Sequence, residues 1–315
     1  MRSQQPSSFS RLTDVFQSVG LLICLPLVVF VLLRALPTDP ARVVLGPNAS
    51  QKSVEILRTQ LGLDRPFSAQ ALAEYRRVVS LDFGKSPVTG RLILPEAFGR
   101  FGITLRIGIG SCAIALIFSL LMCGLFYRFP ILRVMLVPFR LWLALPAFLS
   151  ATLATLAIGS WLPMVSLASG PATERGDWIA LLPPAILASI YSLFLMTRIL
   201  DARVASTVEG PAYRAERAAG FSSLHLFVRA AFRPSCSAWL AAAVNQLSLI
   251  VFTVILVELL LSLPGIGGLL LEAVQRKDLP MLEAILLING AFFILVRAAG
   301  GIAVKALNPP AGRDA

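Results

Sequence analysis

Charged side chains are scarce in this chain of 315 residues: they make up 14% of it, whereas hydrophobic residues make up 57%. Soluble globular domains average about 25% charged residues. A mean hydropathy of +0.79 together with long uncharged apolar runs is typical of a membrane protein. The scarcity therefore excludes an ordinary soluble domain. In such a chain the net charge of +11 is expected to anchor and orient the protein in the lipid bilayer rather than to bind nucleic acid.

Residues that build catalytic sites are also rare. The chain has one histidine, His225, and four cysteines that lie in or beside apolar runs, without metal-ligand or disulfide spacing. These are too few for a zinc site of three or four ligands. A nucleotide-binding loop is missing as well, because Val79 stands where the motif that ends in Gly84-Lys85-Ser86 requires its first glycine. We therefore predict a non-catalytic chain that holds no metal or cofactor and moves a solute.

Long apolar runs predict an all-α, polytopic membrane protein. A helix needs about 20 apolar residues to cross a bilayer. Six segments meet this length, at about 20–36, 101–127, 134–162, 178–200, 236–263 and 281–307. Residues 1–100 then form an N-terminal region, whose part 37–100 lies between the first two spans, and 101–315 form the main transmembrane domain. Within 37–100 we expect a short helix that Ser50 or Ser53 caps and that ends near Gly62.

The distribution of arginine predicts the orientation in the membrane. Arginines precede the first span, follow the second and fill the loop 201–234, whereas the loops on the opposite side are close to neutral. Short loops rich in Lys and Arg stay in the cytoplasm. We expect both termini and the loop 201–234 to face the cytoplasm, and 37–100 to be extracytoplasmic.

The loop 201–234 is the most polar stretch between two apolar runs, and we predict that it docks a cytoplasmic partner. Glu209-Gly210-Pro211 should start a helix and Gly220 should end it. Apolar anchors follow, and arginines at a rim suit an acidic partner. An alternative for any single arginine is that it only sets topology. The predicted docking residues are Arg214, Ala215, Glu216, Ala218, Gly220, Phe221, Leu224 and Phe227.

Polar side chains inside spans are candidates for a translocation path or a gate, because burying them in lipid is costly. They are Asn245, Gln246, Glu258 and Arg297. Glu258 lies late in its span, so a pore or gate role and a structural hydrogen-bonding role are both open. Small residues at helical spacing in the second and third spans indicate close helix contacts.

The ten residues 213–222, YRAERAAGFS, resemble the "EAA" cytoplasmic loop of binding-protein-dependent ABC importer permeases, and the dipeptide, oligopeptide and nickel branch is the closest match. The resemblance extends over essentially the whole chain. Glu216 and Ala219 depart from the small and basic residues that are usual in the loop. The other motifs that carry the resemblance are LPTDP at 36–40, LGLDRP at 61–66, DFGKS at 82–86, LPGIG at 263–267, DLP at 278–280 and NP at 308–309.

The resemblance implies the six-helix type I importer fold in a bacterial inner membrane. It also implies three kinds of partner besides lipid, none of them nucleic acid: a second homologous permease that completes a heterodimer, two ATPase subunits that use ATP and Mg²⁺ and dock on 201–234, and an extracytoplasmic solute-binding protein. The solute would be a peptide, nickel or a metal chelate. Two rival classes remain, a proton-coupled transporter that uses Glu258 and Arg297, and a membrane scaffold or sensor without solute flux.

Overall fold

The chain is mainly helical in the part that the computed structural model describes, which is residues 8–35, 40–45, 49–60, 62–135, 137, 142–159 and 177–307. One isolated bridge between Lys85 and Leu92 is the β pairing within these ranges. The predicted all-α class is therefore confirmed.

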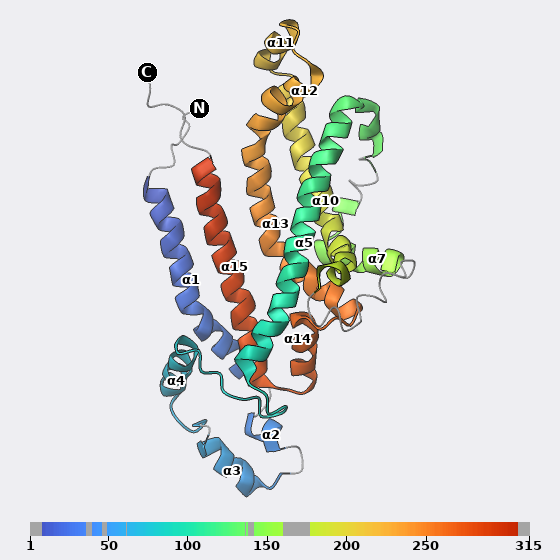
Figure 1. Cartoon of the computed structure of the whole chain (residues 1–315). Coiled ribbons are helices and arrows are strands. Elements are labelled where there is room, and N and C mark those ends of the chain that lie inside the picture. The colour runs from blue at the N-terminus through green and yellow to red at the C-terminus, as the bar shows by residue number, and fades with distance from the viewer. Residues whose placement is uncertain are drawn as a thin grey trace.

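Five long helices set the long axis of the molecule. They are α1 (Ser8–Arg34), α5 (Ile93–Arg128), α10 (Trp178–Val208), α13 (Arg233–Leu260) and α15 (Leu279–Leu307). α5, α10 and α13 pack on one another, and α1 lies along α15 (Figure 1). Apolar side chains on the exposed face of α1, such as Leu21 and Val28, are placed to meet lipid.

Within the described residues, fewer helices are long and apolar enough to be spans than the six that the sequence predicts. Four helices in the described ranges are long and apolar enough to cross a membrane, and α13 makes a fifth if its two parts, which meet at 44°, count as one. The predicted span 134–162 is not one helix. The 3₁₀ turn η1 (Pro130–Met135) comes first, and the chain breaks before α7 (Ala147–Gly159), while 138–141 and 160–162 lie outside the described residues.

Proline explains the start of α7. Pro146 has no N–H and disfavours a helical residue before it, so a helix cannot run through this point without losing a hydrogen bond. The Pro146 carbonyl instead accepts the N–H of Ser150 and opens the new helix. The 13 residues of α7 extend roughly 20 Å, which is less than the bilayer core.

Two spans extend further than their apolar runs. α5 begins at Ile93 rather than near residue 101, and α10 continues to Val208 rather than ending near 200. Polar residues propagate a helix as well as apolar ones do, so hydropathy marks only the part that meets lipid. Asp201, expected in a loop, therefore lies in α10, where its carboxylate pairs with Arg133 of η1 at 3.1 Å.

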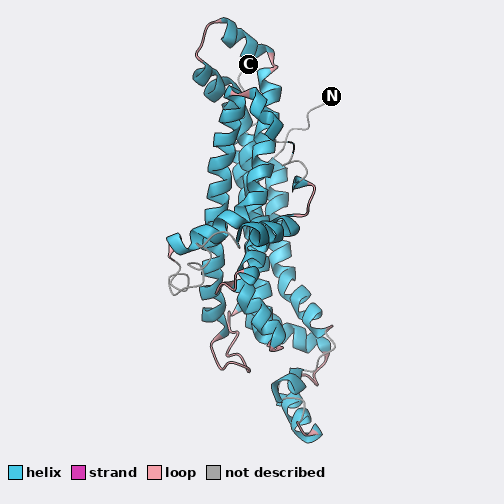
Figure 2. Cartoon of the chain, turned by 90° about the vertical axis from the view of Figure 1, so that its right-hand side faces the viewer, coloured by secondary structure: helices cyan, strands magenta, loops and turns pink. Residues whose placement is uncertain are grey.

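The two ends of the bundle carry different short helices. The start of α1, the end of α15 and the polar segment after α10 lie at one end, at the top of Figure 1. α2 (Pro40–Leu45), α3 (Gln51–Gln60), α4 (Phe67–Val79) and α14 (Ile266–Gln275) lie at the opposite end (Figures 1 and 2). The helix ends nearest the two termini thus share an end with 201–234, as predicted.

The predicted short helix in the segment 37–100 is α3, and its cap is confirmed. Ser50 Oγ accepts the N–H of Ser53 at 3.1 Å, which satisfies one of the free N–H groups at the helix start. The turn after α3 contains Gly62 at φ +66°, a left-handed conformation that favours glycine. Leu61 lies outside the described residues.

α5 is the central helix of the protein. Three clusters of buried apolar side chains follow one another along the bundle, and α5 contributes to each of them. The first joins α5 to α14 and α15, and the other two join it to α10 and α13. Side chains along the whole length of the bundle, at both ends, therefore pack against α5.

Candidate functional site

Residues 209–232, here called the coupling segment, form a compact helical cap on α10 and α13. It contains α11 (Pro211–Ala218), α12 (Ser223–His225) and the π-helix η2 (Leu226–Phe232), which leads into α13. The Arg214 guanidinium donates to the carbonyl of Glu209 at 2.8 Å. Gly220, at φ +83°, ends the turn after α11. The predicted start and end of the helix are thus both found.

The exposed side chains of this segment combine apolar and basic character. Leu224 is 73% exposed, and Phe221, whose ring stacks on His225, is 48% exposed. Val228 adds a further exposed apolar side chain. Among the docking residues predicted on and just after α11, Glu216 is half-buried, and the exposed ones are Arg214, Ala215, Ala218 and Gly220. Phe221, Leu224 and Val228 together are called the apolar ridge.

Phe227 does not belong to the apolar ridge. Its ring centroid lies 5.0 Å from that of Tyr127 on α5 and 6.3 Å from that of Phe232. A Cβ atom on Gly124 of α5 would lie 3.9 Å from the Phe227 ring, an ordinary contact distance, so the ring lies against α5. Phe227 thus attaches the coupling segment to the bundle, and its predicted role as a docking residue stays a prediction.

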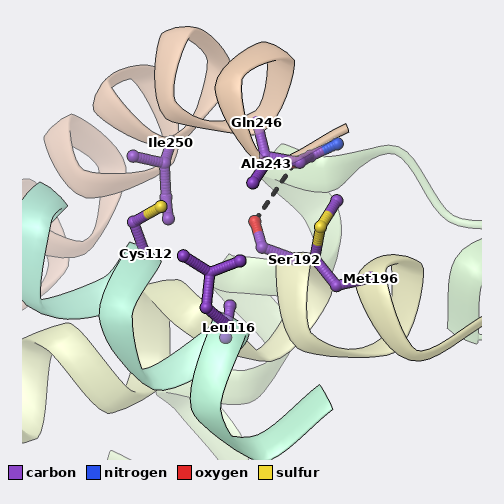
Figure 3. A pocket seen from close by; sticks show the side chains of 8 residues that line it. Cys112, Leu116, Ser192, Met196, Ala243, Gln246 and Ile250 are labelled. Carbon is purple, nitrogen blue, oxygen red and sulfur yellow. Dashed lines mark hydrogen bonds between the residues drawn. The ribbon is translucent and has the colours of Figure 1, made fainter. Parts of the chain in front are cut away.

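Gln246 lies in the middle of the bundle, beside a narrow crevice (Figure 3). Its Oε1 accepts the hydroxyl hydrogen of Ser192 at 3.2 Å. The crevice is too narrow to hold a water molecule, and its lining comes from three helices: Cys112, Ala115 and Leu116 of α5, Ser192 and Met196 of α10, and Ala243, Gln246 and Ile250 of α13. Ser192 is 54 residues from Gln246, so no local pattern could reveal it. Asn245, the neighbouring candidate, is exposed instead.

Glu258 and Arg297 lie at different depths of the bundle. Glu258 is in the last turn of α13, at the end that carries α14. Arg297 is exposed and lies 18 residues after Leu279, roughly 27 Å along α15 from that same end. The two charged groups that the proton-coupled alternative requires are therefore not brought together.

Glu258 is fully buried and ties three elements together. Its Oε1 accepts the hydroxyl hydrogen of Thr104 on α5 at 2.6 Å, and its Oε2 accepts the N–H of Gly267 at 2.8 Å. The Thr104 Oγ1 in turn accepts the N–H of Ile266 at 2.9 Å. A carboxylate at a helix start is favoured by the free N–H groups there. Of the two roles left open for Glu258, the geometry favours the structural one.

The glycines after α13 make room for this carboxylate. A Cβ atom on Gly265 would lie 2.1 Å from the carboxyl carbon of Glu258, and one on Gly267 would lie 2.7 Å from the carbonyl oxygen of Ile255. At distances below 3.0 Å something must shift: the Glu258 carboxyl group if Gly265 is replaced, and the backbone of Ile255 if Gly267 is replaced. The motif LPGIG, with Glu258 just before it, therefore encodes a closed turn around a buried acid.

Two motifs that are far apart in sequence meet near α14. The hydroxyl of Ser86, in the motif DFGKS, donates to Oδ2 of Asp278, in the motif DLP, and both side chains are buried. The other carboxylate oxygen, Oδ1, accepts the N–H of Met281 at 3.2 Å in the first turn of α15. Arg77 of α4 pairs with Glu283 of α15 at 2.6 Å. The segment between the first two spans is thus fastened to the start of α15.

Comparison with known proteins covers nearly the whole chain. The family described as binding-protein-dependent transport system inner membrane component matches residues 115–312, and the N-terminal region of such membrane components matches residues 11–88. The glutathione transport system permease protein GsiC of Shigella flexneri serotype 5b (strain 8401) is 28% identical over 91% of this chain and 94% of that protein. GsiC of Escherichia coli (strain K12) is similar to the same extent.

A protein described as a peptide transport system permease of Brucella suis biovar 1 (strain 1330) is 23% identical over 90% of this chain and 93% of that protein. The resemblance first seen in the coupling segment therefore holds along the chain. The family match spans more than half of the sequence and agrees with the helical membrane architecture. The chain belongs to the binding-protein-dependent transport system inner membrane components and is a multi-pass, non-catalytic permease subunit of an ABC importer in the inner membrane.

Proposed function

We propose that this subunit moves a peptide-like solute inward, and that separate ATPase subunits drive it by docking on the coupling segment. The observation that carries the proposal is the apolar ridge. Phe221 and Leu224 are exposed although they lie beyond the apolar runs that meet lipid, next to the exposed Arg214 and Arg217. Apolar side chains within a polar, basic rim are typical of protein interfaces.

The proposed orientation places the coupling segment and both termini in the cytoplasm. The charge distribution supports it, because arginines cluster at the end of the bundle that carries α11. The segment 37–100 then faces the extracytoplasmic side, where a solute-binding protein delivers the solute. The subunit itself holds no nucleotide, and ATP and Mg²⁺ act in the ATPase partner.

A second, homologous permease subunit completes the path. The crevice beside Gln246 is too narrow for water, so this crevice is not itself the passage, and the proposed path runs between the two permease subunits. Two facing permeases and two ATPases would provide a symmetric arrangement in which each coupling segment has its own docking site.

A peptide is favoured over a bare metal ion as the solute. The relatives are described as glutathione and peptide permeases. Within the described ranges, no group of three or more His, Cys, Asp or Glu side chains is placed to hold a metal. Nickel or a metal chelate stays the alternative solute.

The test introduces a negative charge into the apolar ridge of this subunit, which is co-expressed with the other subunits of the importer. Leu224→Glu should abolish co-purification of the ATPase subunits and ATP-dependent uptake, because a carboxylate would be buried in the interface without a partner. The matched control is Leu72→Glu, which alters an exposed leucine of α4 at the opposite end and should leave both intact. Full ATPase retention by Leu224→Glu would contradict docking at the ridge. Uptake that follows a proton gradient and ignores ATP would contradict the whole proposal.

A further inference from the structure

We infer that the hydroxyl pair of Tyr213 and Tyr127 is the contact through which a displacement of α11 reaches α5 of the membrane-spanning bundle, so both are positioning residues for transport. The inference rests on the proposed docking of an ATPase at the coupling segment. It goes further because it assigns the transmission to one pair of side chains. Neither tyrosine was singled out by its sequence pattern as a transmitting residue.

Tyr213 is the one buried side chain of α11. Its hydroxyl oxygen lies 2.5 Å from that of Tyr127, which is in the last turns of α5, so one hydroxyl donates to the other. The guanidinium of the adjacent Arg214 donates to the Glu209 carbonyl, which belongs to the coupling segment itself. The tyrosine pair therefore links α11 to a helix that is 86 residues away in sequence.

The contact continues into the bundle through aromatic rings. Tyr127 packs on Phe227 at 5.0 Å between ring centroids, and Phe227 packs on Phe232 at 6.3 Å. Phe232 meets Trp239 of α13 edge to face at 6.0 Å, and the Trp239 indole N–H donates to Ser119 Oγ of α5 at 3.2 Å. Ring pairs of this kind resist separation and prefer a fixed geometry.

This string of contacts begins and ends on α5. Tyr127 and Ser119 are eight residues apart, which is roughly 12 Å along the helix axis. α5 is also the helix that contributes to all three apolar clusters. A push on α11 that moves Tyr213 is thus delivered to α5 directly, whereas the covalent routes reach α10 through residues 209–210 and α13 through η2. The hydroxyl pair makes α5 move together with these two helices.

The experiment uses the complete importer, with its partner permease, ATPases and binding protein, in proteoliposomes. Tyr213→Phe, Tyr127→Phe and the double variant each remove a hydroxyl and keep the rings. Solute uptake and ATP hydrolysis are measured together, with glutathione as the probe solute. Tyr75→Phe, at the opposite end of the molecule in α4, is the matched control.

We expect each single variant to lower the solute moved per ATP by roughly two- to tenfold, the range that follows from loss of one buried hydrogen bond. The double variant should be no worse than the worse single variant, because both changes break the same contact. Tyr75→Phe should keep the wild-type ratio. ATPase co-purification should be unchanged in all of them, which separates this inference from docking at Leu224.

Two results would overturn the inference. One is a Tyr213→Phe importer that moves as much solute per ATP as the wild type. This holds even if less of the variant protein reaches the membrane, because a lower amount at an unchanged ratio of solute to ATP indicates a structural role only. The other is a double variant whose loss is the product of the two single losses. If glutathione is not carried by the wild-type importer, a mixture of short peptides replaces it as the probe, and the same ratio is measured.

Discussion

The two ends of the bundle differ in the kind of contact that fastens their short helices. At the end that carries α14, buried acids bond to named partners: Glu258 to Thr104 and Gly267, and Asp278 to Ser86 and Met281. At the end that carries α11, aromatic side chains make the attachment: Tyr213 bonds to Tyr127, and Phe227 packs on the Tyr127 ring. Buried acids therefore fasten the first end, whereas aromatic contacts fasten the coupling segment.

The difference indicates which end of this permease is held rigidly and which end can adjust its position. Satisfied buried polar groups hold α5, α13, α14 and α15 in one arrangement, because breaking any bond there leaves a buried group unpaired. The coupling segment is held to α5 mainly by Tyr213 and Phe227. Substitutions at the α14 end should therefore act on stability, and substitutions at the α11 end should act on coupling.

The largest loss of stability is expected for Gly265→Ala. The new Cβ atom would occupy the site of the Glu258 carboxyl group, at 2.1 Å from its carbon, so the acid must leave its three-element network. We expect about 3 kcal/mol of destabilisation or more. It should appear as a lower midpoint of thermal unfolding in detergent and as less protein in the membrane. Gly102→Ala on α5, where no atom lies within 4 Å, is the matched control and should unfold like the wild type.

Glu258→Ala should cost somewhat less, about 2 kcal/mol, because it leaves Thr104 and the Gly267 N–H without their acceptor but introduces no clash. Thr104→Val should destabilise as well, and the two changes should be less than additive since they share one network. The unfolding midpoints of both single variants and of the double variant test this. Strict additivity would show that the side chains act independently.

Ser86→Ala is expected to cost about 1 kcal/mol, the usual value of a single hydrogen bond. Asp278→Ala should cost more, since it also removes the acceptor of the Met281 N–H in the first turn of α15. Protease cleavage within the segment 37–100 should rise in the same order, because both changes loosen its attachment to α15. Equal cleavage of the two variants and the wild type would refute this attachment.

Gly220→Val should have the smallest effect on stability and a clear effect on coupling. No atom lies within 4 Å of the new Cβ position, so the cost is the local strain of a positive φ, about 1 kcal/mol. The variant should reach the membrane in normal amount and hydrolyse ATP while uptake falls. Uptake at the wild-type level would contradict the role given to this turn.

Hydropathy predicts the helices that meet lipid but not their full extent. The apolar runs locate α1, α5, α10, α13 and α15, because burial in a bilayer requires one continuous apolar helix. The extension of α10 to Val208 and the break before α7 depend on local helix propensity and on Pro146. Turn chemistry is local too, which is why Ser50 and Gly220 are found where the sequence predicts them.

Long-range pairing is what the sequence could not reveal. Glu258 stands out as a buried acid, and Gly265 is only seven residues away, but Thr104 is 154 residues away and has no motif of its own. The inward turn of Phe227 brings its ring against Tyr127 of another helix, 100 residues away in sequence. The exposure of Phe221 and Leu224 could be predicted because their segment is polar overall and lies outside the apolar runs.

Site-specific photocrosslinking in the assembled importer tests the contrast between the two ends most directly. A photoreactive phenylalanine analogue replaces either Leu224 on the apolar ridge or Ile56 of α3, an exposed apolar residue at the opposite end. The account predicts a crosslink from position 224 to the ATPase subunit and none from position 56. No ATPase crosslink from 224, or ATPase crosslinks from 56, would contradict it.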